Sequence, residues 1–209
     1  MAKLYFYYAA MNAGKSTNLL QSNYNYQERG MGTILLTPDL DNRIKTGVIG
    51  SRIGLQAEAY PFSRDCNLFE YVKRTVETAP NNIACVLLDE AHFLTKAHVL
   101  QLTDIVDELN LPVLAYGLRS DYRGEVFEGS QYLLAYADHF IEIKTVCYCG
   151  KKAIMNLRFD KEGKAVKEGQ QVAIGGNDQY LATCRQHFKK PLLQNHLIFS
   201  QPAAVETTE

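Results

Sequence analysis

The chain has 209 residues and a formal net charge of −1, and its 46% hydrophobic and 22% charged residues are those of an ordinary globular protein with one sizeable core. The lysines and arginines are scattered, which argues against a general nucleic-acid-binding protein. No apolar run approaches the roughly 20 residues that span a bilayer, and the N-terminus has no export signal, so we expect a cytoplasmic protein that contacts no membrane.

The first predicted elements are a strand at 3–8, a loop and a helix from Lys15 to Arg29. The loop resembles the phosphate-binding pattern G-x-x-x-x-G-K-[ST], in which backbone amides and the lysine hold phosphates and the hydroxyl serves Mg²⁺. Ala9 replaces the first glycine, which costs little if its φ angle is negative. In the alternative, Gly14 is a plain turn residue and Lys15 is solvated. We predict that ATP binds here, through Ala9, Ala10, Met11, Asn12, Ala13, Gly14, Lys15, Ser16 and Thr17.

Strands and helices then alternate along the chain. Residues 39–54 are polar and contain several glycines, so we expect a loop there. The alternation is typical of βαβ crossovers and predicts an α/β fold, a parallel sheet flanked by helices. Expected strands are 33–38, 83–90, 111–117 and 139–145, and expected helices are 66–79, 96–110 and 128–137.

The composition changes near residue 146, where close-spaced cysteines and glycine-rich turns begin. We therefore predict a nucleotide-binding domain at 1–146, a small second domain at 147–190 and a tail at 191–209. The tail has no hydrophobic period and ends in polar residues, so we expect partial disorder or docking on a neighbour.

Two carboxylates, Asp89 and Glu90, end the expected strand 83–90. Ligands of open α/β sheets bind at the carboxyl ends of the strands, so we expect Asp89 to hold Mg²⁺ together with Ser16. We expect Glu90 to be the catalytic base, with a capping role as its alternative. Residues 89–92 also spell the helicase sequence DEAH, but such motors need a second lobe and an arginine-rich motif that we do not find. His92 is expected to have no catalytic duty.

Cys147, Cys149, Cys184 and His187 form a candidate metal site. On an extended segment residues i and i+2 point to the same side, and a Cys-x-x-His pair fits one turn. Three cysteines and a histidine make a closed tetrahedral set, which is typical of structural Zn²⁺, although four unligated side chains remain the alternative. An odd total of five cysteines argues against a disulfide framework.

These motifs together resemble the type II thymidine kinases, from residue 3 to about residue 188 and most closely in the enterobacterial branch. Members of that branch also have a small residue at the position of Ala9, whereas the family usually has Gln at the position of His92. The resemblance implies transfer of the γ-phosphoryl group of ATP to deoxythymidine, a homotetramer and inhibition by thymidine triphosphate (dTTP). The segments that carry it are AMNAGKST, LLDEAHF, VCYCGKKA (146–153) and VAIGGNDQYLATCRQH (172–187).

The resemblance also implies an acceptor site. A lasso-like loop between the metal pairs, here residues 172–180, would close over the thymine, and Asp41, Asn42 and Arg43 would match the family's D-x-R, with Arg43 meeting phosphate. In the alternatives Phe93 and Phe127 are core residues and Arg43 is merely exposed. The implied substrate-binding residues are Met11, Phe93, Phe127, Val172, Ala173, Ile174, Gly175, Gly176 and Tyr180.

Two other functions stay open at this point. A different P-loop nucleoside or nucleotide kinase would use the same loop and acid. A zinc-containing, nucleic-acid-binding ATPase module is the other possibility, and the near-neutral charge argues against it.

Overall fold

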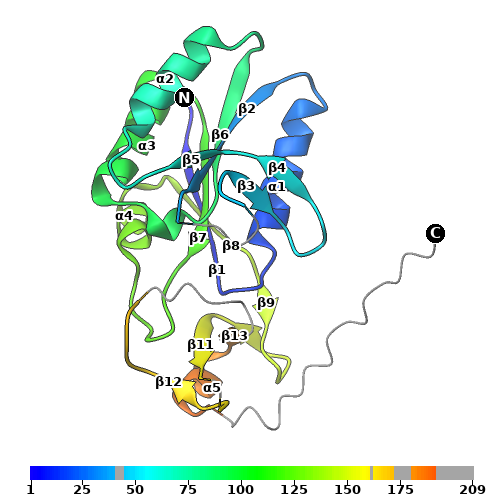
Figure 1. The fold of residues 1–209 in the computed structure, drawn as a ribbon, viewed down its shortest axis with the longest axis vertical. Coiled ribbons are helices and arrows are strands. Elements are labelled where there is room, and N and C mark those ends of the chain that lie inside the picture. The colour runs from blue at the N-terminus through cyan, green and yellow to red at the C-terminus, as the bar shows by residue number, and fades with distance from the viewer. Residues whose placement is uncertain (41–44, 161, 172–179, 192–209) are drawn as a thin grey trace, which may run out of the picture.

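The structure is a computed structural model that describes residues 1–40, 45–160, 162–171 and 180–191. Its centre is a six-stranded sheet with the order β5-β2-β6-β7-β1-β8, in which all neighbouring strands are parallel (Figure 1). The predicted α/β architecture is confirmed. The strands are β1 (Leu4–Ala9), β2 (Gly32–Pro38), β5 (Tyr60–Phe62), β6 (Ile83–Leu88), β7 (Val113–Leu118) and β8 (His139–Glu142).

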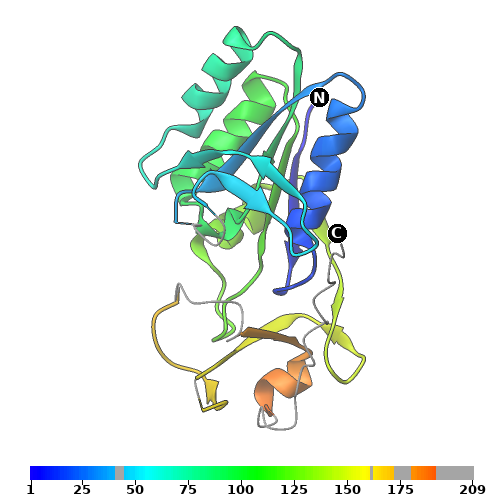
Figure 2. The ribbon, with the colours of Figure 1, turned by 45° about the vertical axis from the view of Figure 1, so that its right-hand side comes forward.

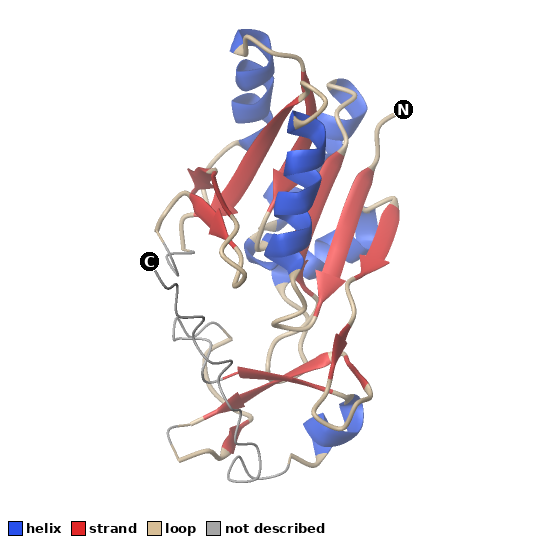
Figure 3. Cartoon of the chain, turned by 90° about the vertical axis from the view of Figure 1, so that its right-hand side faces the viewer, coloured by secondary structure: helices blue, strands red, loops and turns tan. Residues whose placement is uncertain are grey.

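Helices cover both faces of this sheet (Figure 3). Strand β6 is buried on both sides, because Val86 and Leu88 pack with α2, α3 and α4, whereas Cys85 and Leu87 pack with α1. No helix in the described part of the chain combines the length and the apolar character that crossing a membrane requires. The helices are α1 (Lys15–Gln27), α2 (Leu68–Thr78), α3 (Lys96–Glu108) and α4 (Glu128–Tyr136).

Capping residues set where two helices begin. The side chain of Asn67 accepts a hydrogen bond from the Glu70 backbone N–H at 3.1 Å, so α2 starts at Leu68, two residues later than we expected. At α3, Thr95 accepts from the His98 N–H, and the His98 ring accepts from the Thr95 N–H, which forms a reciprocal capping box.

The loop expected at 39–54 is wrong in its last part. Strand β3 (Val48–Gly50) pairs antiparallel with β4 (Gln56–Glu58), and Ile49 is buried in the core that also contains residues of α1. Strands of three residues are too short to show a hydrophobic period. The polar residues and glycines around them therefore favoured the prediction of a loop. The hairpin completes the cover over the α1 face of the sheet.

The C-terminal part lies beyond the carboxyl ends of the long strands (Figure 2). Strands β9 (Thr145–Val146) and β10 (Lys152–Ala153) form one antiparallel pair. A second sheet has the order β12-β11-β13, and helix α5 (Arg185–Lys189) follows β13. The β9–β10 pair crosses the boundary that we predicted at residue 146, and the division into domains stays a prediction. The strands of the second sheet are β11 (Met155–Phe159), β12 (Ala165–Val166) and β13 (Tyr180–Thr183).

Candidate functional site

The predicted phosphate loop connects β1 to α1 at the carboxyl edge of the sheet. Gly14 has a φ angle of 81° and is the residue before the helix, a conformation that glycine adopts without steric cost. Ala9 ends β1 and is not among the non-glycine residues with positive φ, so the expected negative φ is confirmed. The Lys15 side chain is only 8% exposed, and its Nζ donates to the Ala10 carbonyl oxygen at 3.4 Å.

Asp89 meets the phosphate loop directly after β6. The Ser16 hydroxyl donates to Asp89 Oδ2 at 2.8 Å, which joins the loop after β1 to the acid after β6 across the intervening strand β7. Asp89 is 1% exposed. Burial and the neighbouring Glu90 carboxylate raise the pKa of Asp89 to about 6, against the opposing effects of the Ser16 hydrogen bond and the Lys15 charge. A carboxylate and a hydroxyl are hard oxygen ligands, so this pair fits Mg²⁺.

Glu90 occupies an unusual backbone conformation beside this pair. Its φ and ψ angles are 50° and 39°, in the left-handed region that non-glycine residues rarely adopt. Its backbone N–H donates to Asp89 Oδ1 at 2.9 Å. This backbone conformation turns the chain sharply after β6. The carboxylates of Asp89 and Glu90 therefore lie at the same edge of the sheet as Lys15.

His92 lies against Glu90, a contact that sequence reasoning missed. Its Nδ1 is 3.3 Å from Glu90 Oε2 and accepts the Leu118 backbone N–H at 3.3 Å. Both residues belong to the turn around the short 3₁₀ helix η1 (Ala91–Phe93). The sequence did contain a signal for this contact, because Glu90 and His92 are two polar residues spaced i and i+2 just after a buried strand. A lone histidine without a known partner nevertheless favoured an inert role.

Phe93 and Phe127 come together around His92. The His92 ring lies 4.1 Å from the Phe93 ring and 4.6 Å from the Phe127 ring between centroids, and the two phenylalanines meet edge to face at 6.3 Å. Gly129 lets helix α4 approach η1 closely, because a Cβ at this position would overlap the Ala91 carbonyl oxygen. The predicted acceptor aromatics from two loops therefore share one cluster beside Glu90.

The other predicted acceptor residues are more dispersed or lie outside the described residues. Met11 donates its backbone N–H to the side chain of Asn156. Tyr180 begins β13, where burial raises the pKa of its phenol and Arg158 acts against that shift. Residues 172–179 of the predicted thymine loop and residues 41–44 are not described, and they include the predicted site residues Val172, Ala173, Ile174, Gly175, Gly176 and Arg43.

The three cysteines and the histidine predicted to bind a metal converge at one point. Their ligand atoms all lie within 4.8 Å of one another. The Sγ atoms of Cys149 and Cys184 are 3.9 Å apart, and His187 Nδ1 lies 3.4 Å from Cys147 Sγ and 3.6 Å from Cys184 Sγ. Tetrahedral zinc with ordinary bond lengths separates two sulfurs by about 3.8 Å and a sulfur from a nitrogen by about 3.6 Å. The cluster therefore has the geometry of a closed metal site.

Hydrogen bonding within the cluster favours ligation by Cys184. The His187 backbone N–H acts on the Cys184 sulfur and lowers the pKa of that thiol, whereas burial raises the pKa of the Cys147 thiol. The ring of His187 also stacks on Tyr148 at 4.4 Å between centroids, which orients the imidazole.

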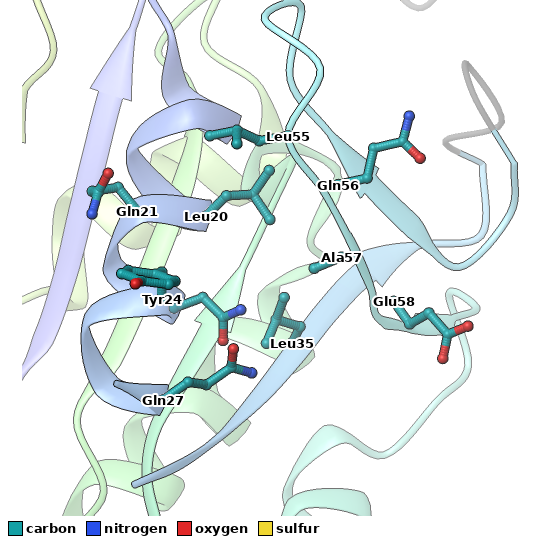
Figure 4. A pocket seen from close by; sticks show the side chains of 10 residues that line it. Leu20, Gln21, Tyr24, Gln27, Leu35, Leu55, Gln56, Ala57 and Glu58 are labelled. Carbon is teal, nitrogen blue, oxygen red and sulfur yellow. The ribbon is translucent and has the colours of Figure 1, made fainter. Parts of the chain in front are cut away.

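A pocket of about 420 Å³ lies elsewhere, between α1 and the β3–β4 hairpin (Figure 4). Leu20 and Tyr24 of α1 line it together with Leu55 and Ala57 from the hairpin side. None of its lining residues belongs to the predicted ATP, acceptor or metal sites. The groups suited to phosphoryl transfer are therefore at the carboxyl edge of the sheet and not in this pocket.

Comparisons with known proteins agree with the site geometry. The thymidine kinase family model matches residues 2–188. The chain is 60% identical to a thymidine kinase of Legionella pneumophila over 91% of this chain and 90% of the relative. It is 57% identical to a thymidine kinase of Vibrio vulnificus, covering 92% and 99% of the two chains. It is 54% identical to a thymidine kinase of Salmonella typhimurium, covering 94% and 95%.

Proposed function

The chain belongs to the thymidine kinase family, and we propose that it transfers the γ-phosphoryl group of ATP to the 5′-hydroxyl of thymidine, giving thymidine monophosphate and ADP. The single observation that carries this proposal is the hydrogen bond of 2.8 Å between Ser16 and Asp89, because it joins a phosphate loop to an acid directly beside Glu90. Phosphoryl transfer depends on positioning and on charge stabilisation more than on covalent help, and these groups supply both.

In the proposed mechanism, backbone amides of the phosphate loop after Met11 and the ammonium of Lys15 hold the phosphates of ATP. Ser16 and Asp89 would hold Mg²⁺, which neutralises charge on the β- and γ-phosphates when bound. Glu90 accepts the proton of the 5′-hydroxyl as that oxygen attacks the γ-phosphorus. The contact of His92 with Glu90 limits the positions open to the carboxylate.

The proposed acceptor site combines the aromatic cluster with the thymine loop. Phe93 and Phe127 would pack around the base and sugar, with Met11 and Tyr180 closing the sides and backbone groups of residues 172–176 pairing with the base edge. Exclusion of water by this loop would favour transfer to the alcohol over hydrolysis of ATP. Arg43 is proposed to meet phosphate.

The Cys/His cluster is proposed to hold structural Zn²⁺. Four protein ligands leave no open coordination position, so the metal would act by stabilising the segment 147–190 and not by catalysis. A cytoplasmic location, a homotetrameric assembly and inhibition by dTTP belong to the same proposal through the family resemblance. Sedimentation equilibrium and inhibition kinetics with dTTP would test the last two.

An acceptor screen tests the proposed activity. With labelled ATP, the purified protein should phosphorylate thymidine in strong preference to deoxycytidine and to thymidylate, because a mismatched base or an added phosphate leaves buried groups unpaired. Lys15→Ala should weaken both ATP binding and turnover. Preference for either competitor would favour another kinase of the same broad class. Salt-dependent binding of labelled DNA, without transfer to any nucleoside, would favour the nucleic-acid module.

A further inference from the structure

Asn156 connects the phosphate loop to the C-terminal strands, and no part of the mechanism above uses it. Its side-chain oxygen accepts the Met11 backbone N–H at 2.8 Å, although 145 positions separate the two residues. Its side-chain NH₂ group donates to the Ser120 carbonyl oxygen at 3.0 Å, just beyond the end of β7. The side chain is on β11 and the residue is only 2% exposed. One amide group therefore joins three separate parts of the chain.

The peptide between Ala10 and Met11 is held from both sides. Its carbonyl oxygen accepts a hydrogen bond from Lys15 Nζ at 3.4 Å, and its N–H donates to Asn156 at 2.8 Å. These two contacts set the orientation of a peptide plane near the start of the loop. In the proposed reaction Lys15 turns to the phosphates of ATP, so Asn156 is then the side chain that keeps this plane in place.

Packing supports the same connection. Ala10 is buried in a cluster with Cys147, Cys184, Ala153 and Ala182, which come from the strands and turns of the C-terminal part. Within the second sheet, Asn156 pairs with Ala182, in the middle of the strand that runs from Tyr180 to Thr183, and Cys184 follows directly. The phosphate loop therefore rests on strands whose ends carry a proposed acceptor residue and a metal-cluster residue.

We propose that Asn156 is a positioning residue for ATP, which fixes the phosphate loop against β11 so that the C-terminal strands complete the donor site. The proposal deepens the proposed function and rests on it. Asparagine suits the position because its short amide offers one acceptor and one donor on the same plane. The N–H of Met11 is already hydrogen-bonded to Asn156. In this proposal the phosphates therefore bind to the backbone amides that follow Met11 in the loop.

The test compares Asn156→Leu with the wild-type protein. Leucine has a similar shape but neither accepts nor donates, so the part-buried Met11 N–H loses its partner. We expect the dissociation constant of a non-hydrolysable ATP analogue, measured with Mg²⁺ by titration calorimetry, to rise about tenfold. The KM for ATP should rise by a similar factor, with a smaller change in kcat at saturating ATP.

A matched control separates positioning from general stability. The side chain of Asn110 accepts the Ala2 backbone N–H at 2.9 Å, near the opposite end of β1. Asn110 has a φ of 52°, so Asn110→Ala loses this bond and strains the backbone. We expect Asn110→Ala to lower Tm while ATP affinity stays within about twofold of wild type. If Asn110→Ala loses as much ATP affinity as Asn156→Leu, a general loss of stability would explain both results, and the proposal would be overturned.

Asn156→Asp provides a second variant if the leucine protein does not fold. Aspartate is nearly isosteric and keeps the acceptor for Met11, but when ionised it cannot donate to Ser120 and places a buried charge against that carbonyl oxygen, so ATP affinity should fall at least severalfold. Wild-type affinity in whichever variant folds would overturn the positioning role and leave the proposed function intact. A wild-type protein that binds no ATP analogue would instead overturn the proposed function itself.

Discussion

Different interactions stabilise the central sheet region and the C-terminal strands. Two continuous cores on the faces of the sheet bury long aliphatic and aromatic side chains from six strands and four helices. Among the described residues, the buried cluster that joins the phosphate loop to the C-terminal part is small and contains Ala10, Cys147, Ala153, Ala182 and Cys184, while Leu157 and Phe159 are buried on β11 outside it. The described C-terminal part buries fewer and mostly smaller apolar side chains than the sheet region, so it has less hydrophobic stabilisation of its own. Metal ligation and polar bridges are therefore the main candidates for ordering it.

The two regions also have different roles in the proposed reaction. The sheet region positions Lys15 at the start of α1 and Asp89 and Glu90 directly after β6, which favours accurate placement of the proposed reacting groups. The C-terminal part contains Tyr180 and the candidate metal cluster, and it contacts the phosphate loop through Asn156. Changes in the sheet region should therefore affect chemistry or global stability, and changes in the C-terminal region should act locally and on ligand binding.

The sharpest test of this division is Glu90→Gln. Glutamine keeps the size of the side chain but cannot take the proton of the acceptor hydroxyl, so kcat should fall by roughly 10²–10⁴-fold. Affinity for an ATP analogue, measured by calorimetry, should stay within about twofold. Unchanged turnover would remove Glu90 as the base, and a parallel loss of ATP affinity would assign it to donor binding instead.

The metal cluster gives the next largest effect. Cys184→Ser, or prolonged chelation, should remove bound zinc and open the C-terminal strands, because their ligation energy is lost while their apolar core is small. Hydrogen exchange should accelerate in residues 145–190 and remain slow in β6 and β7. Cys66→Ser is the matched control, because Cys66 lies outside the cluster, and it should retain the metal. Purified protein with less than about half an equivalent of zinc would contradict the assignment.

A core substitution should show the reverse pattern. Leu102 is fully buried on α3 in the core of the sheet region. Leu102→Ala should lower the free energy of unfolding by roughly 2–5 kcal/mol, measured by urea denaturation, because it removes buried methyl groups and leaves a cavity. Zinc content should remain that of the wild type. Loss of metal in this variant would show that the two regions are not stabilised separately.

Asp89→Asn should have the smallest effect on stability, and its sign depends on pH. Burial raises the pKa of Asp89 to about 6 in the folded protein, above the value of about 4 in an unfolded chain. The folded state therefore binds a proton more tightly, and the contribution of Asp89 to stability falls as pH rises from about 4 to about 6. Without Mg²⁺, calorimetry at pH near 7 should give the variant a Tm several degrees above that of the wild type. The difference should disappear near pH 4, and a constant difference would contradict the shift.

Local patterns in the sequence were enough to predict five of the six strands of the sheet, all except the three-residue edge strand β5, and the groups at its carboxyl edge. Three such patterns depend only on residues that are close in sequence. They are the apolar run that precedes Asp89, the lysine that follows Gly14, and the paired spacings of the cysteines and His187. The contact of Asn156 with Met11 and the packing of His92 on Phe127 could not be predicted, because they join residues that are distant in sequence and leave no period. The predicted roles of Arg43 and of residues 172–176 stay predictions, since they lie outside the described residues.

The tight fit of Gly129 limits how this protein can be redesigned. A methyl group at this position would push the start of α4 away from Ala91, and Phe127 and His92, which flank that contact, would be displaced together. Variant libraries that aim at new nucleoside analogues should therefore keep position 129 unchanged and diversify positions 93 and 127. Under the proposed function, substitutions at those two sites would enlarge the room for a modified base, and because both rings pack on His92, each variant should also be checked for its effect on Glu90.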